Sequence, residues 1–422
     1  MHLPDQAPAL LRDGYLFAGR LRDRLPDDAD PDAIRMRLLG RPALLVRGPD
    51  AVRFFTDTAV VRRHGALPGV VASVLFGQGA VHGLDDAEHL QRKAMFVTII
   101  DAAAVHRLVA SVDDAWRDQL AEWERDGAGS VYDGAVHVFG RSVLGWAGVP
   151  ATPTQAQAVA RDLATIVDGF GVLGPAHLKA RRARHRSDTW ATRLISQART
   201  GVPEADRDSP LATVAGWRDV HGELLPVHTA AVELQNLLRP TVAVARFAAF
   251  TALALHQHPR WRERLAVEDT AGTGAGMPGA LAMAFAQEVR RVSPFVPMLG
   301  ALTREDLTWR GHQLNAGTRL LLDVYGTNLD PRAWPDAPRF LPERFLPGQT
   351  HDPDALVPQG GGEVAVGHRC PGEDIALGLI AVTATALSRA EWELPAQDLT
   401  VNLRRMPTMP ASGVRLANVH SR

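Results

Sequence analysis

Cysteine is almost absent from this chain: Cys370 is the only one in 422 residues. A single cysteine excludes an intrachain disulfide framework and fits a reducing cytoplasm. It also argues against a zinc site, because the scattered histidines lack the close ligand pairing that zinc requires. The chain has no excess of one charge either, since its formal net charge is −1. We therefore expect no broad attraction to nucleic acid or to an acidic membrane.

Long apolar runs are also absent. Residues 1–5 show no basic region followed by an apolar run, and no uninterrupted apolar stretch approaches the ~20 residues of a membrane helix. We therefore predict neither a signal peptide nor a membrane anchor. The Gly- and Pro-rich segments at 200–210, 268–279 and 346–361 indicate loops, but none is long or polar enough for an interdomain linker. We expect residues 1–422 to form a single domain.

Helical periodicity dominates the chain. Apolar spacing predicts helices over 88–124, 154–170, 176–199, 226–258, 280–292 and 373–390. Strand-like segments are fewer and cover 41–46, 307–309 and 319–324, with a turn at 315–317 that predicts a hairpin between the last two. The pattern is typical of a mainly α fold with a small β lobe.

The lone cysteine lies in a glycine-rich segment, residues 359–373 (QGGGEVAVGHRCPGE), just ahead of an apolar helical stretch. Glycines let the backbone approach a flat cofactor closely, and free amide N–H groups can hydrogen-bond the sulfur and tune its charge. We therefore predict that Cys370 is an axial ligand to haem iron. The alternative is a buried structural thiol, which free cysteines often are. Buried cysteines seldom lie among so many glycines and charged residues.

Two further motifs precede this loop in a specific order. Glu288 and Arg291 are spaced i, i+3 on one helical face, a spacing that by itself is typical of a solvated pair. Residues 340–345 (FLPERF) follow, and their Arg344 is predicted to join that pair in a buried charge network. Glu-x-x-Arg, Pro-Glu-Arg-Phe and a glycine-flanked Cys, in this order, resemble the cytochrome P-450 superfamily. The resemblance implies the cytochrome P-450 fold, with haem b between the long central helix and the cysteine loop.

The central helix departs from the ordinary P-450 monooxygenase. That superfamily normally carries an acid–alcohol pair over the haem, whereas residues 231–242 here are AVELQNLLRPTV. Pro240 removes a helical N–H and crowds the carbonyl of Asn236, so we expect a kink there. Arg239 either snorkels to the surface or lies buried, and a buried guanidinium needs an anion that no sequence neighbour supplies. An external carboxylate would satisfy it, because the planar fork of arginine binds both carboxylate oxygens.

The Asn-x-x-Arg-Pro core and the Gln-Gly-Gly-Gly segment before the cysteine resemble the bacterial fatty-acid peroxygenase branch of the superfamily. Glu363 stands where the broader superfamily has an aromatic residue. The resemblance implies a soluble, cytoplasmic bacterial enzyme that uses hydrogen peroxide directly, without nicotinamide, flavin or an obligatory redox partner. A fatty acid would bind Arg239 next to Pro240, its carboxylate replacing the missing acid–alcohol pair. The products would be 2- and 3-hydroxy acids and, by oxidative decarboxylation, terminal alkenes.

The resemblance also implies how the haem propionates are held. His89 and Lys93 are spaced i, i+4 and can point the same way from one helix. The family suggests that both contact propionates, together with Arg63 and His368. The alternative is a solvated basic face, which is the interpretation we favour for the charge run at 179–186, including Arg184.

The choice between hydroxylation and decarboxylation is assigned to two further residues. His82, with Phe76 six residues earlier, resembles the pattern of alkene-forming decarboxylases. Phe76 is predicted to pack against the imidazole, and His82 to donate a proton or to steady the substrate radical, for which a near-neutral pKa is useful. The alternative is a loop histidine satisfied by backbone, with Phe76 as ordinary core.

Two other functions use the same cysteine. A conventional, reductase-dependent P-450 monooxygenase follows if Arg239 faces away from the haem. A non-catalytic haem-thiolate sensor or carrier would need Cys370 but no carboxylate anchor. Such a protein would normally be joined to an output domain, and we detect none in the sequence.

Overall fold

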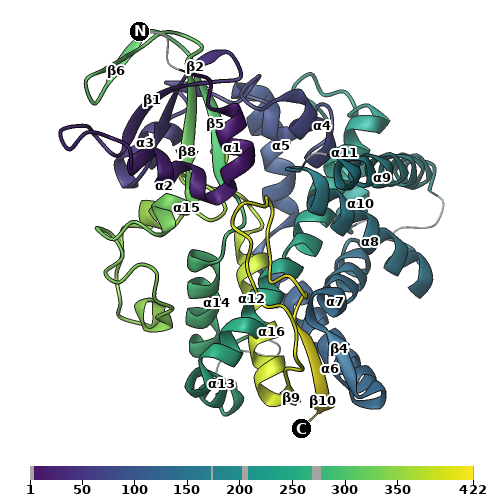
Figure 1. Cartoon of the computed structure of the whole chain (residues 1–422). Helices are drawn as coiled ribbons and strands as arrows, with labels where there is room; N and C mark the ends of the chain where they lie inside the picture. The colour runs from purple at the N-terminus through teal and green to yellow at the C-terminus, as the bar shows by residue number, and fades with distance from the viewer. Residues whose placement is uncertain (1–3, 173, 202–207, 269–276, 422) are drawn as a thin grey trace.

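The structure of the protein is a computed structural model that describes residues 4–172, 174–201, 208–268 and 277–421 (Figure 1). Parts of two predicted loops, 200–210 and 268–279, fall outside the described residues. In Figure 1 the main sheet lies at the upper left beside the N-terminal helices, and helices fill the right and lower parts. The mainly α fold with a small β lobe is therefore confirmed.

The helices follow one another along most of the chain. Those of the N-terminal half are α1 (Ala7–Asp13), α2 (Phe17–Arg22), α3 (Pro49–Thr56), α4 (Gly69–Leu75), α5 (Asp86–Ile99), α6 (Ala102–Asp126), α7 (Val131–Trp146), α8 (Pro153–Gly169) and α9 (Pro175–Arg199). Those of the C-terminal half are α10 (Pro210–Gly216), α11 (Val227–Ala243), α12 (Ala245–Gln257), α13 (Pro259–Ala266), α14 (Ala280–Val292), α15 (Val324–Asn328) and α16 (Glu373–Arg389). Short 3-10 helices are η1 (Gly14–Leu16), η2 (Val81–Gly83), η3 (Pro342–Phe345) and η4 (Pro353–Ala355).

Most predicted helices are confirmed, with two corrections. The single helix predicted over 88–124 is two helices, α5 and α6, which bend by 54° at the break between them. Asp101 causes the new start, because its side chain accepts a hydrogen bond from Ala104 N and caps α6. Helix α7 was missed, since valine and glycine, both poor helix formers, are frequent in it. Tertiary packing overrides this weak propensity, because α7 is mostly buried.

The long central helix consists of α11 and α12. The helix continues through Pro240, where we expected a kink, and is interrupted four residues later at Val244, whose N–H bonds the Thr241 carbonyl at 3.2 Å. By length and composition the span Val227–Gln257 could cross a membrane, but 94% of its most apolar window is buried, as in a core helix. Between residues 230 and 252, Pro240 alone is exposed. Accessible space therefore reaches the middle of this buried helix.

The main sheet has five strands in the order β1-β2-β8-β5-β3. Strands β2 and β8 are parallel, with Leu44 opposite Leu320, and the other neighbours are antiparallel. A second sheet has the order β4-β10-β9. The strands of the two sheets are β1 (Ala33–Leu38), β2 (Arg41–Val46), β3 (Val61–Arg62), β5 (Met298–Thr303) and β8 (Arg319–Asp323), and β4 (Ala128–Ser130), β9 (Glu391–Glu393) and β10 (Arg415–His420).

The predicted hairpin across 315–317 is wrong. Strand β6 (Leu307–Trp309) pairs instead with β7 (His312–Leu314), and that hairpin turns at Arg310 and Gly311, both of which have positive φ. The turn at 315–317 leads from β7 to β8 of the main sheet. The correct turn was overlooked because arginine seldom adopts a left-handed conformation, so only Gly311 signals it.

The predicted charge network of Glu288, Arg291 and Arg344 is confirmed. Arg291 donates two hydrogen bonds of 2.7 Å to the two oxygens of Glu288, and both side chains are fully buried. Arg344 Nε lies 3.7 Å from Glu288 Oε1, and Leu341 N donates to the same oxygen at 2.8 Å. The network joins α14 to the segment that runs toward the cysteine loop.

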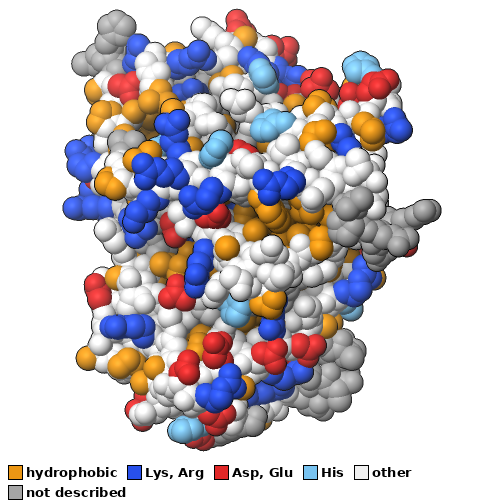
Figure 2. Space-filling view, turned by 90° about the vertical axis from the view of Figure 1, so that its right-hand side faces the viewer, with side chains coloured by type: hydrophobic (Ala, Val, Ile, Leu, Met, Phe, Trp, Pro, Cys, Tyr) orange, Lys and Arg blue, Asp and Glu red, His pale blue; other side chains and the backbone are white. Residues whose placement is uncertain are grey.

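Helix α9 carries a basic outer face. Lys179, Arg181 and Arg182 are exposed, as predicted for the charge run. Figure 2 looks onto the side of the molecule where α8 and α9 lie and shows basic side chains gathered over part of that face. The prediction for Arg184 is wrong, because only 5% of this residue is exposed and it points into the protein.

Candidate active site

The cysteine loop brings N–H groups to the sulfur of Cys370. Gln359 Nε2 lies 3.9 Å from Sγ, and the Gln359 carbonyl accepts a hydrogen bond from Cys370 N at 3.1 Å. Burial raises the pKa of the Cys370 thiol, whereas a hydrogen bond from the Gly372 N–H and the charge of Lys93 lower it. Gly360 has a φ of +92°, a conformation that glycine adopts without strain. Burial outweighs the other effects and leaves the pKa of the thiol raised, while the donors of the loop oppose it by favouring the thiolate.

Lys93 lies next to this loop. Its ammonium donates to the carbonyl of Arg369, the residue before the cysteine, and only 3% of Lys93 is exposed. Burial lowers the pKa of Lys93 to about 8, against the opposing effect of Cys370. Helix α5 thus directs a buried cation toward the cysteine.

The four residues predicted to hold propionates lie together. His89 of α5 stacks on His368 of the cysteine loop, with ring centroids 3.9 Å apart. Burial, together with the charges of Arg63, His89 and Lys93, lowers the pKa of His368 to about 2. Burial also lowers the pKa of His89 to about 4. Because these basic groups destabilise one another's charge, the cluster is suited to an anionic group.

Arg63 faces the same cluster but is held by backbone. Its guanidinium donates to the carbonyls of Gly300 and Phe55, each at 3.1 Å, and lies 4.0 Å from the Phe55 ring centroid. Burial lowers the pKa of Arg63 to about 10, opposed by Asp85. Asp85 also accepts the backbone N–H groups of Arg63 and His64, at 2.7 and 2.9 Å. These hydrogen bonds hold Arg63 and the backbone around it in place beside the two histidines.

Phe76 and His82 pack as the sequence predicts. Their ring centroids are 3.9 Å apart and their planes inclined by 25°. The Nδ1 of His82 is buried and has no hydrogen-bond partner in the described part of the protein. His82 lacks the near-neutral pKa that would be useful for proton donation, because burial, together with the charge of Arg239, lowers its pKa to about 3. His82 is therefore neutral at physiological pH.

Arg239 is buried in α11, and no carboxylate among the described residues forms an ion pair with it. It is 3% exposed, and its guanidinium lies 5.7 Å from the ring centroid of Phe76. One of its terminal nitrogens, NH1, is buried without a hydrogen bond among the residues described. Burial, with a smaller contribution from the charge of Arg184, lowers the pKa of Arg239 to about 9. The surface alternative for Arg239 is thereby excluded.

The two acids nearest to Arg239 are already engaged. Glu233 pairs with Arg92, whose NH1 lies 2.7 Å from Glu233 Oε1. Asp188 Oδ1 lies 2.8 Å from Arg184 Nε and accepts a hydrogen bond from Gln235, also at 2.8 Å. Three guanidinium groups thus face two carboxylates, and one positive charge remains uncompensated. A buried cation of this kind needs an external anion.

Sequence reasoning missed Arg184. It sits four residues before Asp188 on α9 and presses on Gly77, where an added Cβ would come within 2.2 Å of Arg184 NH2. Gly77 also has a φ of +91°, so a larger residue would be strained there. Arg184 therefore supports the segment that carries Phe76. The contact of α9 with the segment after α4 reveals this role.

Comparisons with known proteins agree with this arrangement. A family model described as Cytochrome P450 matches residues 280–415. The solved structure of a variant of cytochrome P450SP alpha (CYP152B1) superposes with a TM-score of 0.92, at 37% identity over 99% of both chains. A structure of a cytochrome P450 OleT variant with arachidonic acid superposes with a TM-score of 0.91, at 30% identity over 99% of this chain and 97% of that one.

The chain belongs to the cytochrome P450 superfamily. Within it, the chain belongs to the fatty-acid peroxygenase and decarboxylase branch, beside P450SP alpha and OleT. A more distant relative is the putative cytochrome P450 137 of Mycobacterium tuberculosis, 25% identical over 401 residues, or 90% of this chain and 80% of that protein.

Membership of the cytochrome P450 superfamily implies haem with cysteine thiolate ligation, and the residues present fit that group. Cys370 has N–H donors at its sulfur, and the basic cluster of His89, Lys93 and His368 lies beside it. The exposure of Pro240 shows that accessible space lies next to the middle of the otherwise buried helix α11. Cys370 would therefore hold the iron, Lys93 would supply positive charge to the propionates, and the neutral rings of His89 and His368 would offer them N–H donors.

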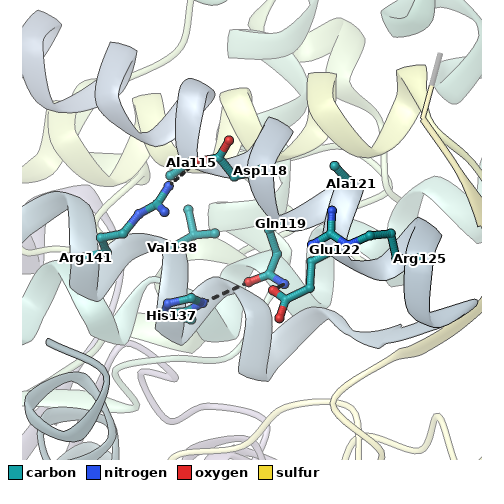
Figure 3. A pocket seen from close by; sticks show the side chains of 9 residues that line it. All are labelled: Ala115, Asp118, Gln119, Ala121, Glu122, Arg125, His137, Val138 and Arg141. Atoms are coloured by element: carbon teal, nitrogen blue, oxygen red, sulfur yellow. Dashed lines mark hydrogen bonds and ion pairs between the residues drawn. The ribbon is translucent and has the colours of Figure 1, made fainter. Parts of the chain in front are cut away.

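A groove on the outer side of α6 and α7 is separate from this site (Figure 3). Its volume is about 360 Å³, and none of its lining residues is a predicted site residue. Figure 3 shows His137 turned toward Gln119, at 3.1 Å, and Arg141 toward Asp118, at 2.8 Å. Because none of the predicted site residues lines it, we assign it no part in the chemistry.

Proposed function

We propose that this cytochrome P450 uses hydrogen peroxide to oxidise long-chain fatty acids at the α and β carbons. The products would be 2- and 3-hydroxy acids and, by oxidative decarboxylation, terminal alkenes. Arg239 carries the proposal, because it is a buried guanidinium whose nearby carboxylates are both paired with other groups. A fatty acid supplies the missing anion. P450SP alpha has been solved with (R)-ibuprophen and OleT with arachidonic acid, and both ligands are carboxylic acids.

In the proposed mechanism Arg239 binds the substrate carboxylate and so fixes the carboxyl end, with its α and β carbons, in the accessible space beside the middle of α11. Haem b, ligated by Cys370, supplies the oxidising chemistry when bound. The carboxylate held by Arg239 takes the proton from one oxygen of peroxide and delivers it to the other, which leaves as water; this is the task of the acid–alcohol pair that α11 lacks. Pro240 lies beside the accessible space at the middle of α11 and leaves room for the head of the substrate.

His82 is assigned a part in product choice. Its imidazole is neutral, so it acts through a ring N–H or a ring lone pair and not as an imidazolium acid. Phe76 holds the ring in place by stacking. From this position His82 exchanges a proton with the substrate and favours loss of carbon dioxide over hydroxylation.

The proposal includes residues 1–422 as one haem domain that needs no nicotinamide, flavin or reductase. Purified protein should therefore convert a long-chain fatty acid when hydrogen peroxide is the sole oxidant. The experiment compares this reaction with one that contains NADPH and a surrogate reductase, with products identified by mass spectrometry. Turnover with peroxide alone supports the proposal. Turnover that requires the reductase identifies a conventional monooxygenase instead.

A further inference from the structure

Glu233 is a fully buried carboxylate in the middle of the site-bearing helix α11. It accepts a hydrogen bond from the backbone N–H of Val81 at 2.8 Å and one from Arg92 at 2.7 Å, both on Oε1. Its other oxygen accepts from the side-chain amide of Asn236 at 3.0 Å. The side chain is 0% exposed, so these bonds are shielded from water.

The three donors come from three parts of the proposed site. Val81 directly precedes His82 in η2, and Arg92 directly precedes Lys93 in α5. Asn236 lies on α11, three residues before Arg239. One carboxylate therefore ties the segment that carries His82 and the helix that carries Lys93 to the helix that carries Arg239.

The hydrogen bond between Val81 and Glu233 bears directly on the position of His82. The N–H of Val81 bonds to the side chain of Glu233 and not to another backbone group. Among the residues that the structure describes, none bonds to His82 Nδ1, so the placement of this ring depends on the stack with Phe76 and on the backbone of η2. Release of the Val81 N–H would free the imidazole to shift relative to Arg239.

We propose that Glu233 is a positioning residue that sets the separation between His82 and the carboxylate site at Arg239, and through it the ratio of alkene to hydroxy acid. The inference rests on the function proposed above. Glu233 touches neither the proposed substrate nor the haem; it acts through the backbone of Val81. A shift of about 1 Å at a catalytic group is enough to change the outcome of a reaction.

Two substitutions at this position separate geometry from charge. Glu233→Gln keeps an oxygen for Val81 and Arg92, and its new N–H₂ group can donate to Asn236 Oδ1, which has no partner in the described structure. Glu233→Leu removes every acceptor. A positioning role predicts the native product ratio for Glu233→Gln and a fall of ~3-fold or more in alkene relative to hydroxy acid for Glu233→Leu. Equal falls in both variants would mean that the charge matters, and would overturn the proposal.

A third variant removes the donor of the hydrogen bond between Val81 and Glu233. Val81→Pro deletes the N–H that bonds to Glu233 and places the ring Cδ against the same carboxylate oxygen, so the bond cannot form. The local backbone accepts proline, because Val81 is the first residue of η2 and Ala80 has extended backbone angles. It should lower the alkene share as Glu233→Leu does. Asp168→Asn is the matched control, since Asp168 pairs with buried Arg246 of the central helix but contacts neither η2 nor Arg239.

The readouts are the product ratio, the carbon monoxide spectrum as a check on haem, and amide hydrogen exchange over residues 80–84. Faster exchange and a lower alkene share in Val81→Pro and in folded Glu233→Leu support the proposal. A native product ratio in either folded variant overturns it. Absence of any product from the wild-type protein would instead contradict the proposed function. Even in that case, native-like slow exchange over residues 80–84 in Glu233→Leu would show that Glu233 does not hold the segment that carries His82.

Discussion

Phe76 lies face to face with His82, with their ring centroids 3.9 Å apart. The same phenyl ring faces Arg239, whose guanidinium is 5.7 Å from its centroid. One aromatic side chain thus joins the proposed carboxylate anchor to the residue that we assign to product choice. Its own segment is held by Arg184, through the close approach of that side chain to Gly77.

Substitution of Arg239 should abolish efficient fatty-acid oxidation. Arg239→Ala removes a bidentate, charge-assisted pair, so we expect kcat/KM to fall ~10²-fold or more while haem is retained. A short carboxylic acid should partly restore turnover of non-native substrates, because it supplies the missing acid group. Arg193→Ala, an exposed residue of α9, serves as the control. Native fatty-acid oxidation by Arg239→Ala would reject the peroxygenase assignment.

Substitution of His82 should change which product forms. We expect His82→Gln to shift the mixture toward 2- and 3-hydroxy acids, because glutamine cannot exchange a proton as imidazole does. Phe76→Ala should have the same direction of effect, since it removes the stack that orients the ring. The measurement is the alkene fraction by gas chromatography across a chain-length series. If the native protein makes hydroxy acids and no alkene, the decarboxylase half of the proposal is wrong.

Cys370 should determine the spectrum of the haem. We expect the ferrous protein with carbon monoxide to show the red-shifted Soret band of thiolate ligation, because N–H donors from the cysteine loop support the charged sulfur. Cys370→Ser should lose this band. A histidine-type spectrum in freshly purified, active protein would contradict the ligand assignment.

Neutralisation of Glu288 should destabilise the fold. Glu288→Gln leaves Arg291 buried without its bidentate partner, so we expect the free energy of unfolding to fall by about 3–5 kcal/mol. Chemical denaturation of the haem-loaded protein measures the change. Asp336→Asn is the control, because Asp336 and Arg339 form an ion pair whose side chains are 64% and 68% exposed. A loss no larger than that of the control would show that the buried network contributes little.

Local motifs account for what the sequence predicted well. The cysteine loop, Glu288 with Arg291, and the stack of Phe76 on His82 each depend on residues close together in the chain, or on a family pattern that fixes their order. The bend between α5 and α6 was missed because a periodic pattern does not register a change of axis. The hairpin at Arg310 was missed because an arginine with positive φ has no clear sequence signal.

Long-range packing accounts for what the sequence could not predict. Arg184 lies in a run of basic residues and is buried only because α9 packs on α11 and α4. The low pKa of His82 has the same origin, since burial and Arg239 come from elements far apart in the chain. The hydrogen bonds of Glu233 to Val81 and Arg92 likewise span more than a hundred residues.

The most direct test of the account compares a long-chain fatty acid with its methyl ester, each given to the purified protein with hydrogen peroxide as the sole oxidant. The two substrates share the same chain and differ in the carboxylate that Arg239 is proposed to bind. The account predicts rapid oxidation of the acid near its carboxyl end and little or no oxidation of the ester. Equal oxidation of acid and ester would contradict it.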